Sequence, residues 1–194
     1  SVSADEFARI ACEQWLDVRS FGQVFAFKSG KAGEGVSDGV RGPVSIHTAT
    51  SVDPIDITSM QITKSVNSEP GKDRGSDTMG MKHRVDSGVY VFYGSINTQL
   101  AEKTGFSRQD AEKFKQALVS LFENDASSAR PEGSMEVHTV YWWEHHTKIG
   151  DYSSAKVHRS LTINRLVDEP KGFADYELSV RPLDGLEVEI LDGR

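Results

Sequence analysis

The sequence predicts an α+β domain with a ferredoxin-like order of elements and a long inserted β-hairpin. Two amphipathic helix patterns alternate with three strand patterns. In chain order, these patterns cover residues 3–15, 24–27, 89–97, 107–124 and 136–144. The order helix, strand, strand, helix, strand is that of a βαββαβ unit without its first strand. With 194 residues, we expect a single domain with the hairpin inserted at residues 58–86.

The first helix pattern begins with a complete start signal. Ser3 is the expected N-cap, and Glu6 is its capping-box partner three residues later. Spacings of three and four define the apolar face that we expect to pack on a sheet: Phe7, Ile10, Ala11 and Trp15. The single cysteine, Cys12, lies in this helix, where we expect a small buried residue.

Two strand patterns and a loop follow this helix. Residues 24–27 suit a short strand, and residues 29–39 are rich in Gly, Ser and Lys, which is typical of an exposed loop. Residues 40–50 resume as a strand. Because Pro43 cannot donate a ladder hydrogen bond, we expect this strand to start at or follow a sheet edge.

The inserted hairpin is expected to be a long β-arm. Residues 60–66 alternate in side-chain character and form its first leg, while residues 79–85 form the returning leg. Residues 67–78 contain Pro and Gly among charged side chains and predict a mobile tip. The arm leads into residues 89–93, which are all β-branched or aromatic and predict a mostly buried strand.

The second half of the chain carries the other helix pattern and several strand patterns. Ser107 is the expected N-cap of this helix, with Asp110 in the capping-box position. Further strands are predicted at residues 136–144, 157–165, 176–180 and 186–191.

Composition limits the classes of function. A net charge of −7 and a pI of about 5.4 argue against a generically basic nucleic-acid binder. The charge is unevenly placed, however. Residues 166–194 carry eight acidic and three basic side chains, whereas residues 64–84 carry five basic and three acidic ones. We expect the arm to be the cationic element and the acidic tail to face a basic surface of a neighbouring subunit.

The cellular setting follows from what the sequence lacks. One cysteine excludes an internal disulfide framework and fits a reducing cytosol. No apolar run approaches the ~20 residues of a membrane helix, and no signal peptide is visible. The chain starts at Ser1 without Met and directly on a helix pattern, so we expect the N-terminal strand to be missing from a longer protein.

Four motifs in series carry a resemblance to a known family. They are DVRSFG, VRGPVSIHTATSVDPI, DTMGMKHRVDSGVYVFYGSIN and EVHTVYWWEH. Together they resemble the backbone subunit of CRISPR Cascade complexes, the Cas-seven superfamily, most closely its type I-C form. The resemblance runs in the right order from about residue 15 to residue 165, which is most of the chain.

The resemblance implies a fold and a function. Family members have an RRM-like core with insertions, polymerise side by side along CRISPR RNA (crRNA), and grip its backbone without reading sequence. A β-hairpin thumb displaces a nucleotide at regular intervals, so that short segments pair with target DNA. It further implies other Cas subunits as partners, no membrane, no cofactor and no catalysis. The expected arm is the natural candidate for the thumb.

The candidate RNA-binding residues come from the first two motifs and from the arm. They are Arg19, Ser20, Phe21, Arg41, Lys64, Met79, Met81, Lys82, His83 and Arg84. Lys and Arg neutralise phosphates whatever the base, and Met can wedge against an unstacked base. The alternatives are a brace between Arg19 and Asp17 or another nearby carboxylate, a solvated hairpin face for the arm cations, and core packing for the two methionines.

Catalytic alternatives rest on histidines and aspartates. One is an RNA-processing enzyme that uses His83 or His138 as general acid or base, and another is a type III relative that cuts target RNA through Asp77 or Asp86. The spacing of His138, His145, His146 and His158 matches no compact metal-ligand pattern. On a strand, the adjacent His145 and His146 would also point to opposite faces. No GxSxG elbow is present.

Overall fold

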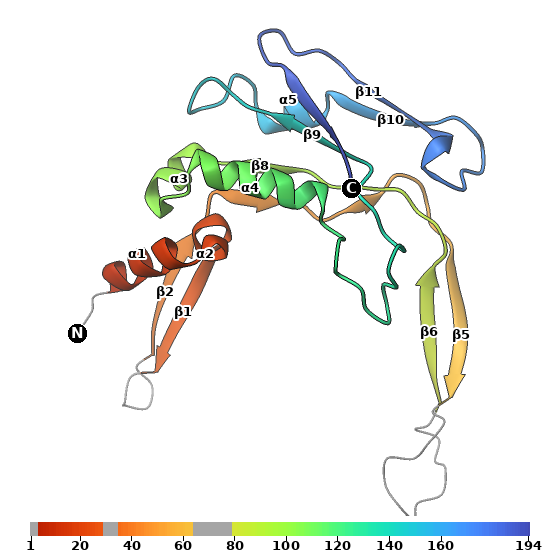
Figure 1. Cartoon of the computed structure of the whole chain (residues 1–194), viewed down its shortest axis with the longest axis horizontal. Coiled ribbons are helices and arrows are strands. Elements are labelled where there is room, and N and C mark those ends of the chain that lie inside the picture. Colours follow the sequence, from red (N-terminus) through yellow and green to blue (C-terminus); the bar gives the residue numbers. More distant parts are fainter. Residues whose placement is uncertain (1–3, 29–34, 64–78) are drawn as a thin grey trace, which may run out of the picture. The chain divides into compact units, whose positions relative to one another are not determined.

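The computed structural model describes residues 4–28, 35–63 and 79–194. Within them the chain is α+β, as predicted, with short helices and small antiparallel sheets, and this is compatible with an RRM-like fold (Figure 1). The helices are α1 (Ala4–Gln14), α2 (Leu16–Phe21), α3 (Thr98–Thr104), α4 (Arg108–Val119), α5 (Ser154–His158) and the 3-10 turn η2 (Phe173–Asp175). The strands are β1 (Gly22–Lys28), β2 (Gly35–Arg41), β3 (Val44–Ile46), β4 (Thr50–Ser51), β5 (Ile57–Thr63), β6 (Met79–Val85), β7 (Tyr90–Val91), β8 (Gly94–Ile96), β9 (Thr139–Trp143), β10 (Leu161–Arg165), β11 (Tyr176–Val180) and β12 (Val188–Asp192).

The chain forms two compact units. The first comprises Ser1–His47, Tyr93–Leu161 and Val180–Arg194, and the second comprises Thr48–Phe92 and Thr162–Ser179. Helices α1 to α5 belong to the first unit, whereas the β5–β6 hairpin belongs to the second.

In the first unit, α1 and α2 pack on the ribbon formed by β1 and β2. Their buried hydrophobic side chains are Ala11, Cys12 and Val18, which pack with Phe25 and Val40. Cys12 is buried, as predicted. The apolar face predicted for this helix is wrong at Ile10 and Trp15, which are 38% and 52% exposed. The buried face centres on Ala11 instead, and Trp15 falls in the joint between α1 and α2.

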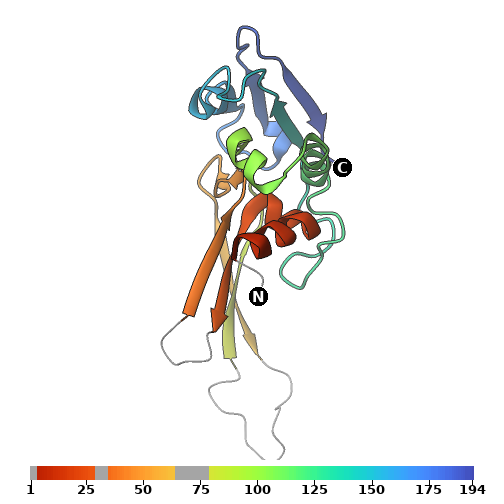
Figure 2. The same ribbon diagram turned by 90° about the vertical axis from the view of Figure 1, so that its left-hand side faces the viewer.

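The β1–β2 ribbon is longer than the sequence indicated, and the figures show it from two sides (Figures 1 and 2). Residues 35–39 were expected in a loop, but they pair with β1 in a register that runs from Gly22↔Arg41 to Lys28↔Gly35. The prediction was wrong because ladder hydrogen bonds join backbone groups, which Gly and Ser supply as well as other residues. The short helix α2 was also missed, because six residues are too few for a periodic pattern.

A second small core in the first unit joins α3 and α4 to the β3–β8 pair. Its side chains are Val44, Ile96, Ala101, Phe106, Ala111 and Phe114. The predicted capping box of α4 is confirmed, since the Ser107 side chain accepts from the Asp110 N–H and the Asp110 carboxylate accepts from the Ser107 N–H. The helix ends at Val119, five residues before the predicted end.

The third core of the first unit lies beside the β9–β12 pair. It contains Trp143, Tyr152, Val157, Leu183 and Leu186. The strand predictions for β9, β11 and β12 are confirmed with small shifts at their ends. The strand predicted from residue 157 is wrong in its first half, because Val157 and His158 end α5 before β10 begins.

The second unit carries the hairpin and short strand pairs. β5 pairs with β6, and β4 pairs with β7 over only two residues. The buried strand predicted at residues 89–93 is therefore wrong: Tyr90 is 45% exposed and Phe92 is 37% exposed. A strand with so short a ladder leaves these aromatic side chains open to solvent, whatever its β-propensity.

Candidate nucleic-acid interface

The β5–β6 hairpin is the described part of the expected arm. Its register pairs Ile57 with Val85, Ser59 with His83 and Thr63 with Met79. Because directly opposite residues of an antiparallel pair share a face and side chains alternate along each strand, this register divides the arm into two chemically different faces. The candidate residues on the arm are therefore not one cluster.

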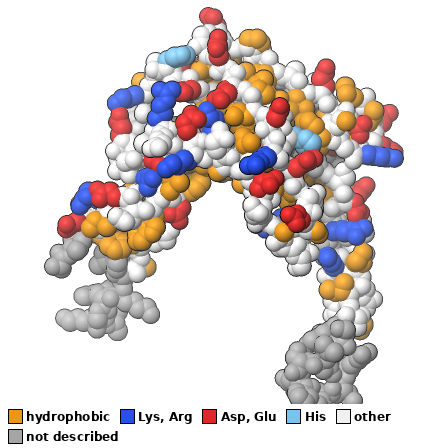
Figure 3. All heavy atoms as spheres, viewed as in Figure 1, with side chains coloured by type: hydrophobic (Ala, Val, Ile, Leu, Met, Phe, Trp, Pro, Cys, Tyr) orange, Lys and Arg blue, Asp and Glu red, His pale blue; other side chains and the backbone are white. Residues whose placement is uncertain are grey.

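One face, here named the cationic face, carries the Lys and Arg side chains of the described part of the arm. It consists of Thr58, Met60, Ile62, Lys82 and Arg84. All five are at least partly exposed. Cationic and hydrophobic side chains lie beside one another over this hairpin (Figure 3). Arg84 donates through Nε to Asp86 Oδ1 at 2.7 Å, so its charge already has a partner in the chain.

The opposite face, here named the methionine face, carries most of the arm's apolar surface. It consists of Ile57, Ser59, Gln61, Thr63, Met79, Met81, His83 and Val85. Met79 and Met81 are 55% and 56% exposed, so the alternative of core packing does not hold for them. Gln61 Nε2 lies 3.0 Å from Met79 Sδ, and Ser59 Oγ lies 2.8 Å from His83 Nδ1. Lys64, the remaining candidate on the arm, lies outside the described residues.

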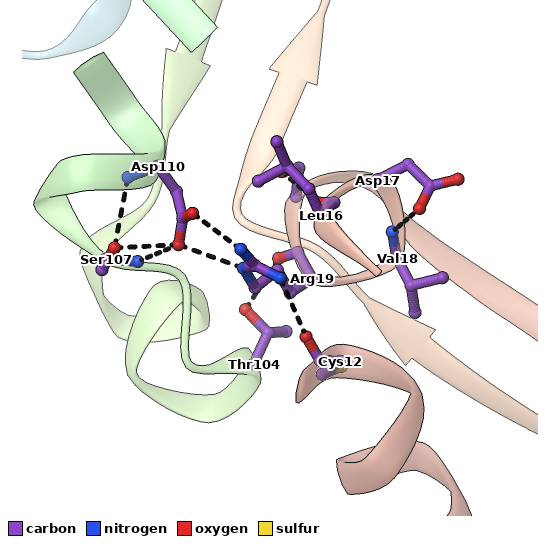
Figure 4. A network of polar contacts seen from close by, with 9 residues as sticks. Cys12, Leu16, Asp17, Val18, Arg19, Thr104, Ser107 and Asp110 are labelled. Carbon is purple, nitrogen blue, oxygen red and sulfur yellow. Dashed lines mark hydrogen bonds and ion pairs between the residues drawn. The ribbon is translucent and has the colours of Figure 1, made fainter. Parts of the chain in front are cut away.

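Arg19 is held inside the first unit by a polar network (Figure 4). Its Nη2 and Nε donate to Asp110 Oδ1 and Oδ2 at 2.8 and 3.1 Å, and its Nη1 lies 3.4 Å from the Cys12 carbonyl. Thr104 Oγ1 donates to the Arg19 carbonyl at 2.8 Å. The guanidinium lowers the pKa of Asp110 well below its usual range, mainly through this hydrogen bonding, and the pKa of Arg19 is raised in turn. The structure therefore shows the brace, with Asp110 as the carboxylate.

The two residues after Arg19 face different surroundings. Ser20 is buried, and its hydroxyl donates to the Leu16 carbonyl at 2.5 Å. Phe21 is 51% exposed and meets Phe114 edge-on, with ring centroids 5.9 Å apart. Of these two candidates, only Phe21 presents its side chain to a ligand in solution.

Arg41 lies exposed at the end of β2, opposite Gly22. Gly42, the residue after Arg41, lies directly against the chain's own backbone, because a Cβ at residue 42 would overlap the backbone of Ser20 and Phe21. The absence of a side chain at Gly42 thus lets the chain after β2 pack closely against α2, while the Arg41 side chain remains exposed to solvent. The glycine in VRGP indicates that a backbone can approach closely here, but the sequence does not indicate that the approaching backbone is that of Ser20 and Phe21.

The histidines near the end of β9 come together, contrary to the prediction. The strand ends at Trp143, so the alternation that separates His145 from His146 does not apply to them. Asp151 accepts from the His146 N–H at 2.7 Å, and its own N–H donates to His145 Nδ1 at 2.9 Å. This is a loop held by hydrogen bonds. Among the described residues no group of three or more His, Cys, Asp or Glu is placed to hold a metal ion.

Part of the acidic tail has a structural role within the chain. Glu189 on β12 accepts from the buried Lys115 of α4 at 2.7 Å. Lys115 also contacts Glu112 at 3.0 Å and lies over the Trp142 ring. The carboxylate of Glu189 is thus paired within the first unit. The composition of the tail did not indicate this pairing.

The comparison with protein families decides the assignment. The family model described as CRISPR-associated protein Cas7 matches residues 1–181, nearly the whole chain. The chain belongs to the Cas7 family. A search of curated proteins finds no match.

Membership makes this Cas7 chain a CRISPR-associated backbone subunit of a Cascade complex, as the four sequence motifs indicated. Cas7 proteins generally serve in such complexes without catalysing a reaction, alongside crRNA and other Cas subunits. In the described part of this chain, no helix combines the length and the apolar character that crossing a membrane demands.

Proposed function

We propose that this Cas7 chain is a non-catalytic, type I-C backbone subunit that polymerises along crRNA and holds it with the β5–β6 arm. The observation that carries the proposal is the division of the arm into a cationic face and a methionine face. A single thin element thus presents two kinds of chemistry that suit the two parts of a nucleotide.

The cationic face suits the phosphates of the RNA. Lys82 and Arg84 stand on neighbouring positions of one strand face, about 7 Å apart along the strand at roughly 3.4 Å per residue. Contacts of this type neutralise phosphates whatever base they carry and account for sequence-independent binding. Met60 and Ile62 on the same face offer apolar surface to the sugars.

The methionine face suits an unstacked base. Met79 and Met81 stand on neighbouring positions of β6 and are more than half exposed. Thioether side chains are flexible and polarizable, and they make favourable contacts with aromatic rings. If the phosphates of the RNA follow the cationic face and one base turns to the methionine face, the RNA is bent at the arm. This bend displaces that base from its neighbours.

Phe21 and Arg41 of the first unit are proposed as further RNA contacts. Both side chains are exposed in the structure. The partners of the assembly are crRNA, target DNA through the crRNA duplex, copies of the same chain side by side, and other Cas subunits. The location that goes with them is the prokaryotic cytoplasm.

Charge reversal on the arm tests the proposal. In the full-length protein, Lys82→Glu with Arg84→Glu should weaken RNA binding at least 10-fold at low salt, because two favourable phosphate contacts become repulsive. The matched control is Lys103→Glu with Lys113→Glu, two exposed helix positions of the first unit, which should weaken binding far less. Unchanged RNA affinity in the arm variant would overturn the assignment of the arm.

Stepwise assembly tests the polymer. Native mass measurement on RNAs of increasing length should show complexes that grow by one whole subunit at regular length increments. One subunit bound whatever the RNA length contradicts the backbone role.

A further inference from the structure

Arg84 on the cationic face already holds an anion from its own chain. Its Nε donates to Asp86 Oδ1 at 2.7 Å, and the other carboxylate oxygen, Oδ2, accepts from the Thr58 hydroxyl. Thr58 lies directly opposite Arg84 in the hairpin register, and Asp86 follows the last residue of β6. The three side chains thus form a closed unit at the base of the arm.

The charge of Asp86 persists at neutral pH. Its pKa lies below the usual carboxyl range, mainly because the Thr58 hydroxyl donates to it and also because Arg84 is close. A charged carboxylate that accepts from a guanidinium N–H presents the same chemistry as a phosphate oxygen. Arg84 is therefore electrostatically compensated before any RNA arrives.

We propose that Asp86 is a resident counter-anion that an RNA phosphate displaces from Arg84, so that it limits the affinity of each arm for RNA. This inference rests on the proposed RNA-binding function of the arm. It gives Asp86 a role that is neither catalytic nor purely structural: the carboxylate sets how strongly one subunit holds RNA.

The exposure of the pair makes the exchange possible. The side chains of Arg84 and Asp86 are 54% and 53% exposed, and ion pairs this open to solvent contribute little to stability. A phosphate with its own fixed position on the RNA can replace such a partner. A weak grip per subunit also makes stable binding depend on several subunits held side by side, since linked weak contacts multiply in strength.

Asp86→Asn is the decisive variant. Asparagine keeps the size of the side chain and an oxygen that can accept from Arg84 Nε, but it removes the negative charge. Titration of the full chain with a single-stranded RNA should show affinity raised about 2–5-fold, which corresponds to about 0.4–1 kcal/mol. The slope of log affinity against log salt concentration should steepen by up to about one, the value for one further phosphate contact, because Arg84 is then fully available. Asp86→Ser, which also removes the charge, should give the same direction.

Two controls separate the proposed exchange from a general loss of negative charge. Asp56 is exposed and directly precedes β5, so Asp56→Asn removes a charge close to the base of the arm without touching Arg84. It should change affinity less than Asp86→Asn does. In an Arg84→Met background, Asp86→Asn should give no gain, because the group that Asp86 occupies is gone.

The outcomes are distinct. A gain that is larger than that of Asp56→Asn and disappears in the Arg84→Met background supports the proposal. An unchanged or weakened affinity in both folded Asp86 variants, or a gain that persists without Arg84, overturns it. If the charge reversal at Lys82 and Arg84 still weakens binding, only the role of Asp86 fails. If that reversal has no effect either, the proposed function of the arm fails.

Discussion

The guanidinium of Arg19 meets the carboxylate of Asp110 side-on, with Nη2 2.8 Å from Oδ1 and Nε 3.1 Å from Oδ2. The two residues are 91 positions apart, and their side chains are only 19% and 6% exposed. Asp110 is at the same time the capping-box residue of α4. One carboxylate therefore accepts from the N–H of the N-cap residue Ser107 and also fastens α2 to α4.

Removal of Arg19 should destabilise the protein rather than remove an RNA contact. Arg19→Met leaves Asp110 charged and largely buried, which we expect to lower the free energy of unfolding by roughly 3 kcal/mol, at the lower end of such losses because Ser107 still donates to the carboxylate. Urea unfolding followed by circular dichroism measures it. RNA affinity per folded molecule should stay within about twofold of wild type, well under the effect of losing a phosphate contact.

Arg9 provides the matched control for this loss. It forms an exposed pair with Glu13 one turn along α1, and the two side chains are 59% and 56% exposed. Arg9→Met should cost at most about 0.5 kcal/mol. Equal losses for the two variants would contradict the bracing role of Arg19.

The same pair predicts a pH dependence of stability. The pKa of Asp110 in the folded protein is lowered, chiefly by Arg19. Its stabilising contribution is therefore fully present above the ordinary carboxyl pKa of about 3.9 and is lost as the pH falls from there toward the lower folded value. The difference in unfolding free energy between wild type and Asp110→Asn should be constant from pH 7 to 5 and shrink below about pH 4. A difference that grows on acidification would show that the sign is wrong.

The sequence correctly predicted those structural elements that depend on residues close to one another in the chain. The capping box of α4 follows from Ser107 and Asp110 three residues apart. The first leg of the arm follows from its alternation. The pairing of β5 with β6 confirms this leg over residues 60–63 and the returning leg over residues 79–85, whereas β5 begins three residues earlier than predicted, at Ile57, and residues 64–66 lie outside the described residues. In each case the interacting groups are near neighbours in the chain or repeat with the period of the element.

Contacts between residues far apart in the chain could not be predicted from the sequence. Nothing in DVRSFG indicates which carboxylate binds Arg19, and the partner lies in another helix. Residues 35–39 read as a loop because their pairing is carried by backbone groups. Residues 89–93 read as buried because composition reports a preference for burial, whereas actual burial depends on what covers the strand. Tertiary contacts decide all three.

Gly42 should tolerate no side chain. A Cβ at this position would overlap the backbone of Ser20 and Phe21, which cannot move without shifting α2. Gly42→Ala should therefore lower the unfolding free energy by about 1–3 kcal/mol. Gly39→Ala, in the strand β2 that precedes Gly42, is the matched control, since a Cβ there meets no atom within 4 Å. It should be neutral or stabilise by up to about 1 kcal/mol. Similar losses for both variants would contradict the close approach at Gly42.

The two faces of the arm should differ in how salt affects their contributions to RNA binding. Lys82→Gln removes one proposed phosphate contact from the cationic face, so it should weaken binding and lower the slope of log affinity against log salt by about one. Met79→Ala with Met81→Ala removes apolar surface from the opposite face, so it should weaken binding about 5–50-fold while the slope stays unchanged. Titrations of the full chain at three or more salt concentrations measure the RNA affinity and its salt slope.

Met135→Ala changes an exposed methionine of the first unit and is the control. It should affect neither the RNA affinity nor the salt slope. A methionine-pair variant whose slope falls as that of Lys82→Gln does would mean that the two faces do not contact different parts of the RNA.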